Sequence, residues 1–195
     1  MKTTLRIFTA TFALTLAHAS AAEKFEIDPV HSTIGFKVKH LFSYVTGRFN
    51  DVQGTITVDA AKPEDSAVEV KIATKSINTA NEKRDTHLRS PDFFDAEKFP
   101  EMTFKSKKVV RTGEDTADVT GDFTLHGVTK EVVLKVKFLG KGKGMTGGLQ
   151  TGWEAKTAIK RSDYGLTWSK IIEGTAVVGD EIEIELQIEA PAAKA

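Results

Sequence analysis

Apolar and polar residues alternate strictly near the C-terminal end of the chain. From Glu181 to Glu189 every even position is aliphatic, and every odd position is a carboxylate or an amide. Only a β-strand has a side-chain period of two, whereas a helix would spread these carboxylates around its circumference. A strand with one dry face and one wet face is typical of an antiparallel sheet, because parallel strands are covered on both faces.

The same alternation recurs along most of the chain and predicts about eight strands. The runs cover residues 25–27 with 32–39, 49–59, 68–72, 102–106, 119–125, 132–138, 149–159 and 181–189. Turn residues separate most of them, so the strands form an antiparallel meander. Such a meander stacks as a sandwich or closes as an up-and-down barrel. We favour the barrel, because closure removes exposed strand edges and leaves room for a small ligand.

One long segment, residues 76–100, breaks the alternation. Residues 81–89 are the best candidate for a short helix, which starts near Thr79 and ends before Pro91. Loops of this length in a compact domain are functional or disordered, and the three aromatic residues that follow the helix argue against disorder. These are Phe93, Phe94 and Phe99. A second irregular aromatic segment covers residues 164–168.

The N-terminal residues 1–22 have the pattern of a secretory signal peptide. A basic start with Lys2 and Arg6 precedes a short apolar run, and a small-residue cleavage site follows at residues 19–22. We therefore expect a signal peptide over 1–22, one barrel domain over 23–190 and a frayed tail over 191–195. The mature chain is expected to be soluble and periplasmic, with no integral membrane segment.

Composition narrows the function classes. Without Lys2 and Arg6 the 27 Lys and Arg become 25, against 27 Asp and Glu, and no basic stripe exists. Nucleic acid is therefore not an expected partner. The chain has no Cys, which excludes disulfides and cysteine metal sites, so the fold depends on its core.

Several residue patterns could carry chemistry, but none has the required context. Residues 142–147 match G-x-G-x-x-G, yet a strand follows instead of a helix, so we interpret them as a hairpin turn. The histidines His31, His40, His87 and His126 lack metal-ligand spacing, and we expect His31 and His126 to satisfy turn backbone and His40 to end its strand. No nucleophile elbow exists. We predict no metal, no cofactor and no catalytic residue.

Two arginines lie next to aspartates in the irregular segments: Arg84 precedes Asp85, and Arg161 lies two residues before Asp163. Structural ion pairs are one interpretation. The other is that Arg84 or Arg161 faces the head group of a ligand, because guanidinium offers a fork of donors to phosphate or carboxylate.

Taken together, the chain resembles the YceI family of bacterial exported lipid-binding proteins over nearly its whole mature length. Seven pieces carry the resemblance in order: IDPVHS (27–32) with FKVKH (36–40), VTGRF (45–49), SINT (76–79), RDTHLRSPDFFD (84–95), FPEMTF (99–104), GDFTLHGVT (121–129) and IKRSDYG (159–165). The resemblance implies an all-β, lipocalin-like antiparallel barrel with a long hydrophobic tunnel. It also implies a polyisoprenoid, isoprenoid quinone or fatty-acid derivative as ligand, and it supplies no catalytic residue.

We therefore expect a carrier that encloses one lipid tail, and we predict its ligand-binding residues. Inward-facing strand positions should line the tunnel together with side chains from the two irregular segments: Phe36, Val38, Ile56, Val70, Ile72, Arg84, His87, Phe93, Phe94, Phe104, Phe123, Leu134, Trp153, Arg161, Trp168 and Ile184, with Ile34 and Val136 beside them. One alternative is an enzyme or stress factor that uses Arg84, Asp85 and His87 on small isoprenoid or acyl compounds. Another is a barrel packed solid, and monomer and homodimer both stay open.

The loop over residues 76–100 has two interpretations in this scheme. It is the gate of the tunnel, with Phe93, Phe94 and Phe99 over the mouth, or it is a permanent plug at one barrel end.

Overall fold

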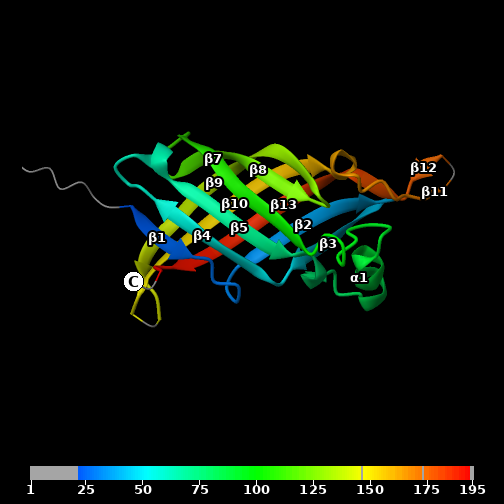
Figure 1. Cartoon of the computed structure of the whole chain (residues 1–195), viewed down its shortest axis with the longest axis horizontal. Helices are drawn as coiled ribbons and strands as arrows, with labels where there is room; N and C mark the ends of the chain where they lie inside the picture. The colour runs from blue at the N-terminus through cyan, green and yellow to red at the C-terminus, as the bar shows by residue number, and fades with distance from the viewer. Residues whose placement is uncertain (1–21, 146, 173, 194–195) are drawn as a thin grey trace, which may run out of the picture.

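The computed structural model describes residues 22–145, 147–172 and 174–193, and Figure 1 shows an elongated molecule built almost wholly of β-strands. Of the predicted signal peptide, all but Ala22 lies outside the described residues. The main sheet has the order β1-β4-β5-β7-β8-β9-β10-β13-β2-β3-β6, and its strand pairs are antiparallel. Its strands are β1 (Glu23–Glu26), β2 (Thr33–His40), β3 (Ser43–Phe49), β4 (Val52–Val58), β5 (Ala67–Ala73), β6 (Ile77–Asn78), β7 (Glu101–Arg111), β8 (Thr116–Leu125), β9 (Val128–Lys143), β10 (Leu149–Lys160) and β13 (Val178–Pro191). A separate hairpin joins β11 (Ile171–Ile172) to β12 (Thr175–Ala176).

The sheet is strongly curled, and its first strand returns to β13. Phe25 in β1 bridges Ala192, Lys24 accepts a hydrogen bond from Ala193 N at 2.8 Å, and Asp28 N donates to the carbonyl of Glu189 at 2.9 Å. Within the predicted tail, Pro191 is the last residue of β13, Ala192 N bonds to β10 and Ala193 N bonds to β1. The curled sheet consequently has an enclosed inner face.

The predicted all-β antiparallel meander is confirmed, but the predicted count of about eight strands is wrong. The main sheet has eleven, partly because the first run is divided into β1 and β2 by a turn at residues 28–32. The turn forms because Asp28 Oδ1 accepts a hydrogen bond from Val30 N at 2.8 Å. A further strand, β3, was missed entirely, as were the β11–β12 hairpin and the two-residue β6.

The missed strand β3 pairs with β2 in a hairpin, and Gly47 explains why its alternation is weak. Gly47 takes an inward-facing position where the pattern should show a large apolar residue. It lies opposite Phe36, and a Cβ at this position would collide with the Phe36 ring. The interior at this point is therefore filled by the ring of the neighbouring strand.

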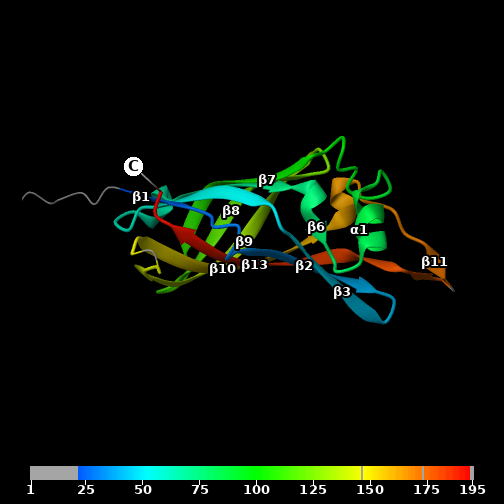
Figure 2. The ribbon, with the colours of Figure 1, turned by 90° about the horizontal axis from the view of Figure 1, so that it is seen from below.

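The predicted short helix is confirmed as α1 (Glu82–Arg89). Asn81 caps it, since its side chain accepts a hydrogen bond from Arg84 N at 3.0 Å. The helix ends at Arg89, and its C-cap Ser90 directly precedes Pro91. Figure 2 shows α1 at the same end of the molecule as the β2–β3 hairpin and β11. Three 3₁₀ turns complete the fold: η1 (Pro63–Asp65), η2 (Thr74–Ser76) and η3 (Arg161–Tyr164).

Three further sequence-based assignments are confirmed. Between β9 and β10, Gly144 N donates to the carbonyl of Gly148 at 2.8 Å, so the G-x-G-x-x-G match lies at a turn between strands. His40 is the last residue of β2, as expected. His126 has its ring Nδ1 3.2 Å from the backbone carbonyl of Tyr164, as expected for a turn histidine.

Candidate functional site: an apolar tunnel

The inner face of the curled sheet encloses a cavity of about 570 Å³, which we call the tunnel. Its wall contains thirteen of the sixteen residues predicted to bind ligand: Phe36, Val38, Ile56, Val70, Ile72, Phe93, Phe94, Phe104, Phe123, Leu134, Trp153, Arg161 and Ile184. Ile34 and Val136 lie in the wall as well. The volume falls in the range of about 300–1,000 Å³ usual for small-molecule sites. The alternative of a barrel packed solid with its own side chains is therefore ruled out.

Strand periodicity explains why the wall is apolar. In β13 the even positions Ile182, Ile184, Leu186 and Ile188 line the tunnel, while their odd neighbours carry the charges. The four even residues are only half-buried although they face inward, because the tunnel lies in front of them. On the outer face the charges form cross-strand ion pairs, such as Lys37 Nζ with Glu183 Oε2 at 3.0 Å. The alternation thus separates a dry wall from a charged exterior.

Arg161 seals one end of the tunnel. Its side chain is 8% exposed, and it donates from Nε to the carbonyl of Gly179 at 2.8 Å and from Nη1 to that of Trp168 at 2.8 Å. Nη1 also donates to Leu166 O, and Nη2 to Val178 O at 3.4 Å. Burial lowers the pKa of Arg161, which still leaves a guanidinium at neutral pH. The arginine thereby holds β13 and the segment after η3 together across the end of the sheet.

Aromatic side chains complete this end, which we call the capped end. Phe94 meets Phe49 edge-on, with ring centroids 5.7 Å apart, and Tyr164 packs edge-on against Phe123 at 5.7 Å. Tyr164 is only 1% exposed, and burial raises the pKa of its hydroxyl. Leu88 of α1 also lines the tunnel from this side.

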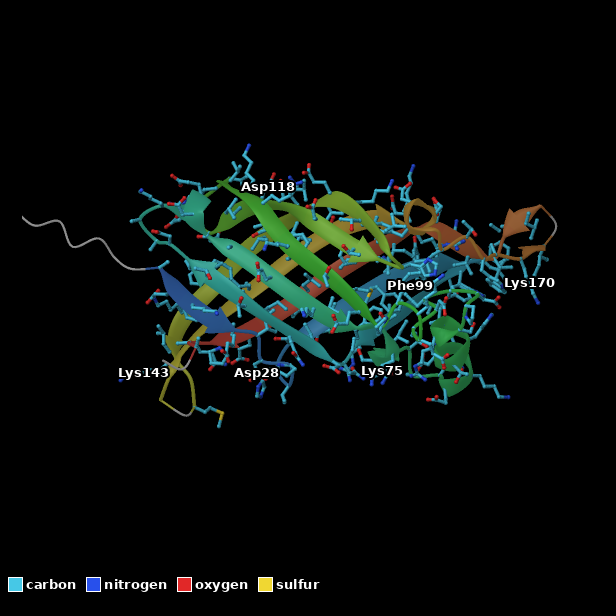
Figure 3. The ribbon with its side chains drawn as sticks, in the orientation of Figure 1. Asp28, Lys75, Phe99, Asp118, Lys143 and Lys170 are labelled. Carbon is cyan, nitrogen blue, oxygen red and sulfur yellow. The ribbon has the colours of Figure 1, made fainter. Side chains whose placement is uncertain are left out.

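The opposite end of the tunnel meets solvent. Five residues of the wall are exposed, and all five lie at the end framed by the η1 segment and the β7–β8 turn: Ala60, Arg111, Glu114, Asp115 and Lys141. We call this the open end. No exposed residue of the described wall belongs to the capped end. In Figure 3, Lys170 lies toward the capped end and Lys143 toward the open end.

Three predicted ligand-binding residues lie outside the tunnel wall: Arg84, His87 and Trp168. Arg84 donates from Nε to Thr79 Oγ1 at 2.7 Å and from Nη2 to the carbonyl of Thr79 at 2.8 Å. The neighbouring Asp85 is buried and accepts a hydrogen bond from Thr79 N at 2.9 Å. These groups therefore tie α1 to the residue that follows β6, and they do not line the tunnel.

His87 and Trp168 form an outer layer over the capped end. Nε2 of His87 lies 2.8 Å from Asp92 Oδ2. The His87 ring packs edge-on against Phe93 and against Trp168, with ring centroids 5.0 Å apart in both pairs. Phe99 also lies outside the wall, and its ring packs at a tilt against His126 with centroids 4.4 Å apart. The loop over residues 76–100 thus covers the capped end, which favours the plug over the gate.

The expected ion pairs Arg84–Asp85 and Arg161–Asp163 are absent from the ion pairs formed within the described residues. Both arginines use neutral oxygens instead, and those of Arg161 are all backbone carbonyls. His31, expected to bond to turn backbone, pairs with the side chain of Asp28 at 2.8 Å. The hydrogen bond from His31 lowers the pKa of Asp28, and the same bond raises the pKa of His31.

Sequence reasoning missed the polar residues at the open end. Glu23, Asp59, Arg111, Glu114, Asp115 and Lys141 all line it. The signal was present in part, since a charged turn over residues 113–115 separates two runs of alternation. The register of the curled sheet determines which strand ends meet around the tunnel, and the sequence alone does not reveal this register.

The chain has relatives among known proteins. A model of the YceI-like domain family matches residues 25–190. A UPF0312 protein of Pseudomonas putida (strain W619) is 39% identical over 190 residues, which cover 96% of each chain. A second UPF0312 protein, from Pseudomonas fluorescens (strain Pf-5), is 48% identical over 141 residues, or 69% of this chain and 71% of the relative.

Solved structures show the same fold. The YCEI protein of Campylobacter jejuni superposes with a TM-score of 0.70 at 34% identity, covering 95% of this chain and all of the other. BcnA of Burkholderia cenocepacia gives 0.75 at 22% identity, covering 84% of this chain and 98% of the other. A domain of Saccharophagus degradans described as polyisoprenoid binding gives 0.64 at 19% identity, covering 87% and 98%. Among the described residues, no helix has the length and hydropathy needed to cross a bilayer.

Proposed function

Because the chain belongs to the YceI family, we propose that it is an exported carrier that holds the apolar chain of one lipid inside the tunnel. The observation that supports this most is the tunnel itself, whose wall is mostly aliphatic and aromatic and has its exposed charged residues at one end. A long hydrocarbon chain in water costs about 0.8 kcal/mol for each exposed CH₂, so a carrier must enclose it. The polyisoprenoid-binding description of a protein with the same fold is consistent with such a ligand.

Family and fold point to a binding protein rather than an enzyme. The enzyme hypothesis depended on Arg84, Asp85 and His87 as acid-base groups near the ligand. All three lie outside the tunnel wall, and their polar atoms bond to Thr79 or Asp92. No other observation favours a reaction.

The experiment is native mass spectrometry and lipid extraction of protein purified from its own periplasm without detergent. We expect one bound lipid per chain, and an N-terminus created by cleavage after Ala21 or Ala22. A preparation that carries no lipid and takes up no prenyl lipid would overturn the proposed carrier function. An uncleaved N-terminus on protein confined to the cytoplasm would overturn export.

A pair of substitutions on β10 tests whether the lipid lies in the tunnel. Ala155 lines the tunnel, whereas Ala158 on the same strand faces outward and is exposed. Ala155→Trp should fill the tunnel and abolish lipid uptake, and Ala158→Trp should leave uptake unchanged. If Ala155→Trp fails to fold, Ala117→Phe, nearer the open end, provides a smaller obstruction. Uptake unaffected by either tunnel variant in folded protein would place the lipid elsewhere.

A further inference from the structure

Two hairpins at the capped end carry large apolar side chains into solvent. The β2–β3 hairpin and the β11–β12 hairpin lie side by side, because Leu41 N donates to the carbonyl of Val177 at 3.0 Å. Figure 2 shows both of them projecting beyond the barrel at the end that carries α1. Their exposed apolar side chains, which we call the apolar tip, are Phe42, Tyr44, Ile171 and Ile172.

The apolar tip departs from the pattern of the rest of the sheet, which turns aliphatic side chains inward and charges outward. Phe42 is 97% exposed and Ile171 is 75% exposed, both in short hairpins where turn residues are usually polar or glycine. Together the four side chains expose on the order of 500 Å². A contiguous exposed patch of this size marks an interaction site, so we expect an apolar partner to cover it.

The area and shape of the tip favour a bilayer over a protein partner. A stable dimer buries about 800 Å² on each partner, in a closely complementary surface. The tip offers less area and presents it on two projecting hairpins. A bilayer interface requires no complementary shape, and it accommodates aromatic and aliphatic side chains at the level of the headgroups.

The β2–β3 hairpin also has the charge that a phospholipid surface attracts. Residues 37–48 contain Lys37, Lys39 and Arg48 and no acidic residue. Lys37 pairs with Glu183 of β13 at 3.0 Å, so an excess of two positive charges remains on the hairpin. Lys39 and Arg48 are exposed, and their stems can lie along a membrane surface while their charges reach lipid phosphates.

The excess positive charge is confined to this hairpin. Residues 166–178 contain one cation and one acid, residues 160–163 with 180–181 contain two cations and three acids, and the loop over residues 76–100 contains four cations and five acids. The capped end as a whole is therefore close to neutral. We expect apolar burial to provide most of the binding and anionic lipids to add a smaller part.

We propose that the apolar tip docks the protein on a phospholipid bilayer. Docking is a further activity of the outer surface and does not depend on what the tunnel holds. Its depth is limited, because residues 43–47 of β3 pair only with β2 within the described chain, and their outer backbone groups need water or lipid headgroups. A molecule docked in this way directs its open end away from the bilayer.

Flotation of the mature protein with vesicles of phosphatidylethanolamine and phosphatidylglycerol tests docking. The double variant Phe42→Ser, Ile171→Ser should bind at least about tenfold more weakly than the wild type. The matched control Val30→Ser, Met145→Ser removes two other exposed apolar side chains, at turns away from the two hairpins, and should bind like the wild type. A wild type that does not float, or a control that loses as much affinity as the double variant, would overturn the proposal.

Lipid charge tests the role of the two cations. The wild type should bind these vesicles a few-fold more tightly than vesicles of phosphatidylcholine, and Lys39→Gln, Arg48→Gln should remove that preference. The control Lys62→Gln, Lys143→Gln removes the same charge from exposed positions near the open end and should retain it. Equal binding of the wild type to both kinds of vesicle would overturn the role of Lys39 and Arg48.

A single surface tryptophan reports which end docks. In a background of Trp153→Phe and Trp168→Phe, we expect brominated lipids to quench the emission of Phe42→Trp and to leave that of Met145→Trp unchanged. Quenching of Met145→Trp alone would place the bilayer at the open end and would overturn the proposal. Sedimentation velocity checks the remaining occupant: a wild-type dimer that does not float and that is lost in Phe42→Ser, Ile171→Ser would show that a second copy covers the tip instead.

Discussion

Arg161 and Arg111 stand at opposite ends of the tunnel and bond in the same way, yet their surroundings differ. Each arginine donates hydrogen bonds to backbone carbonyls: Arg111 to residues two and three positions ahead, and Arg161 to Trp168 and to Gly179 of β13. Arg161 is buried, whereas Arg111 is exposed. Water can replace the partners of Arg111 but not those of Arg161, so only the buried arginine should contribute strongly to the stability of the fold. The difference shows that one end is built to stay closed and the other to exchange with solvent.

The largest expected effect comes from removing the buried arginine. Arg161→Met keeps the aliphatic stem but leaves several buried carbonyls without donors, so we expect the free energy of unfolding to fall by about 3–5 kcal/mol. Arg111→Met, the matched change at the open end, should cost less than about 1 kcal/mol because its carbonyls can bond to water. Urea unfolding with an unchanged m-value measures both. Equal losses would contradict the contrast between the two ends.

The second-largest expected loss of stability comes from removing an aromatic ring at the capped end. Phe94→Ala removes a ring that meets Phe49 edge-on and lines the tunnel, and we expect it to cost about 2–4 kcal/mol. Phe42→Ala, at a side chain 97% exposed, is the control and should change stability by less than about 0.5 kcal/mol.

The same variant decides between plug and gate. For a plug, Phe94→Ala should leave the release rate of a fluorescent prenyl analogue close to that of the wild type, measured by stopped flow below the melting transition. A release rate that rises several-fold without loss of stability would instead support the interpretation of the loop as a gate.

A smaller effect is expected where α1 is attached to β6. Asp85 accepts hydrogen bonds from the backbone N–H and the hydroxyl of Thr79, and all of these groups are buried. Asp85→Asn keeps one acceptor oxygen but weakens both hydrogen bonds, because a carboxylate accepts more strongly than an amide, and should cost about 1–3 kcal/mol. Asp92→Asn, which alters an exposed partner of His87, should cost less than about 0.5 kcal/mol. A thermal melt of each variant makes the comparison, and an Asp85→Asn protein as stable as the wild type would refute this role.

Local alternation predicted the sheet and the wall, because a period of two determines which side chains share a face. The inward positions of β13 and the opposing Phe104 and Phe123 of β7 and β8 were found in this way. The helix α1 was equally accessible, since Pro91 marks its end locally, although the predicted start near Thr79 lies two residues before the Asn81 cap. These features depend only on residues close in sequence.

The features that the sequence did not predict depend on residues far apart along the chain. Strand β3 has a glycine where the Phe36 ring of β2 fills the interior, and no local pattern reveals this. Arg84 and Arg161 have the same residue type and a nearby aspartate, but only the fold shows that Arg161 reaches the wall and Arg84 does not. Which end is open follows from which turns close over the sheet, a property of long-range register.

The smallest expected effect is a pH dependence at the turn between β1 and β2, where Asp28 pairs with His31. The lowered pKa of Asp28 means that its contribution is present above its unfolded value of about 3.9 and is lost as pH falls through the folded pKa. The raised pKa of His31 means that its contribution is present below about 6.5 and is lost as pH rises through the folded pKa. The pair should therefore stabilise the turn most between about pH 4 and 6.5.

This window is tested by melting temperatures of the wild type and His31→Asn from pH 5 to 8.5. The wild type should lose a small part of its stability as pH rises through the folded pKa of His31, and His31→Asn should lack that part. Because His31 is exposed, solvent screens the pair and the change should be close to the precision of the measurement, far below that for Arg161→Met. Asp28→Asn breaks the same pair from the other side and should flatten the profile in the same range. If the melting temperatures of the wild type and of both variants change with pH in the same way across this range, the charge on His31 does not stabilise the turn.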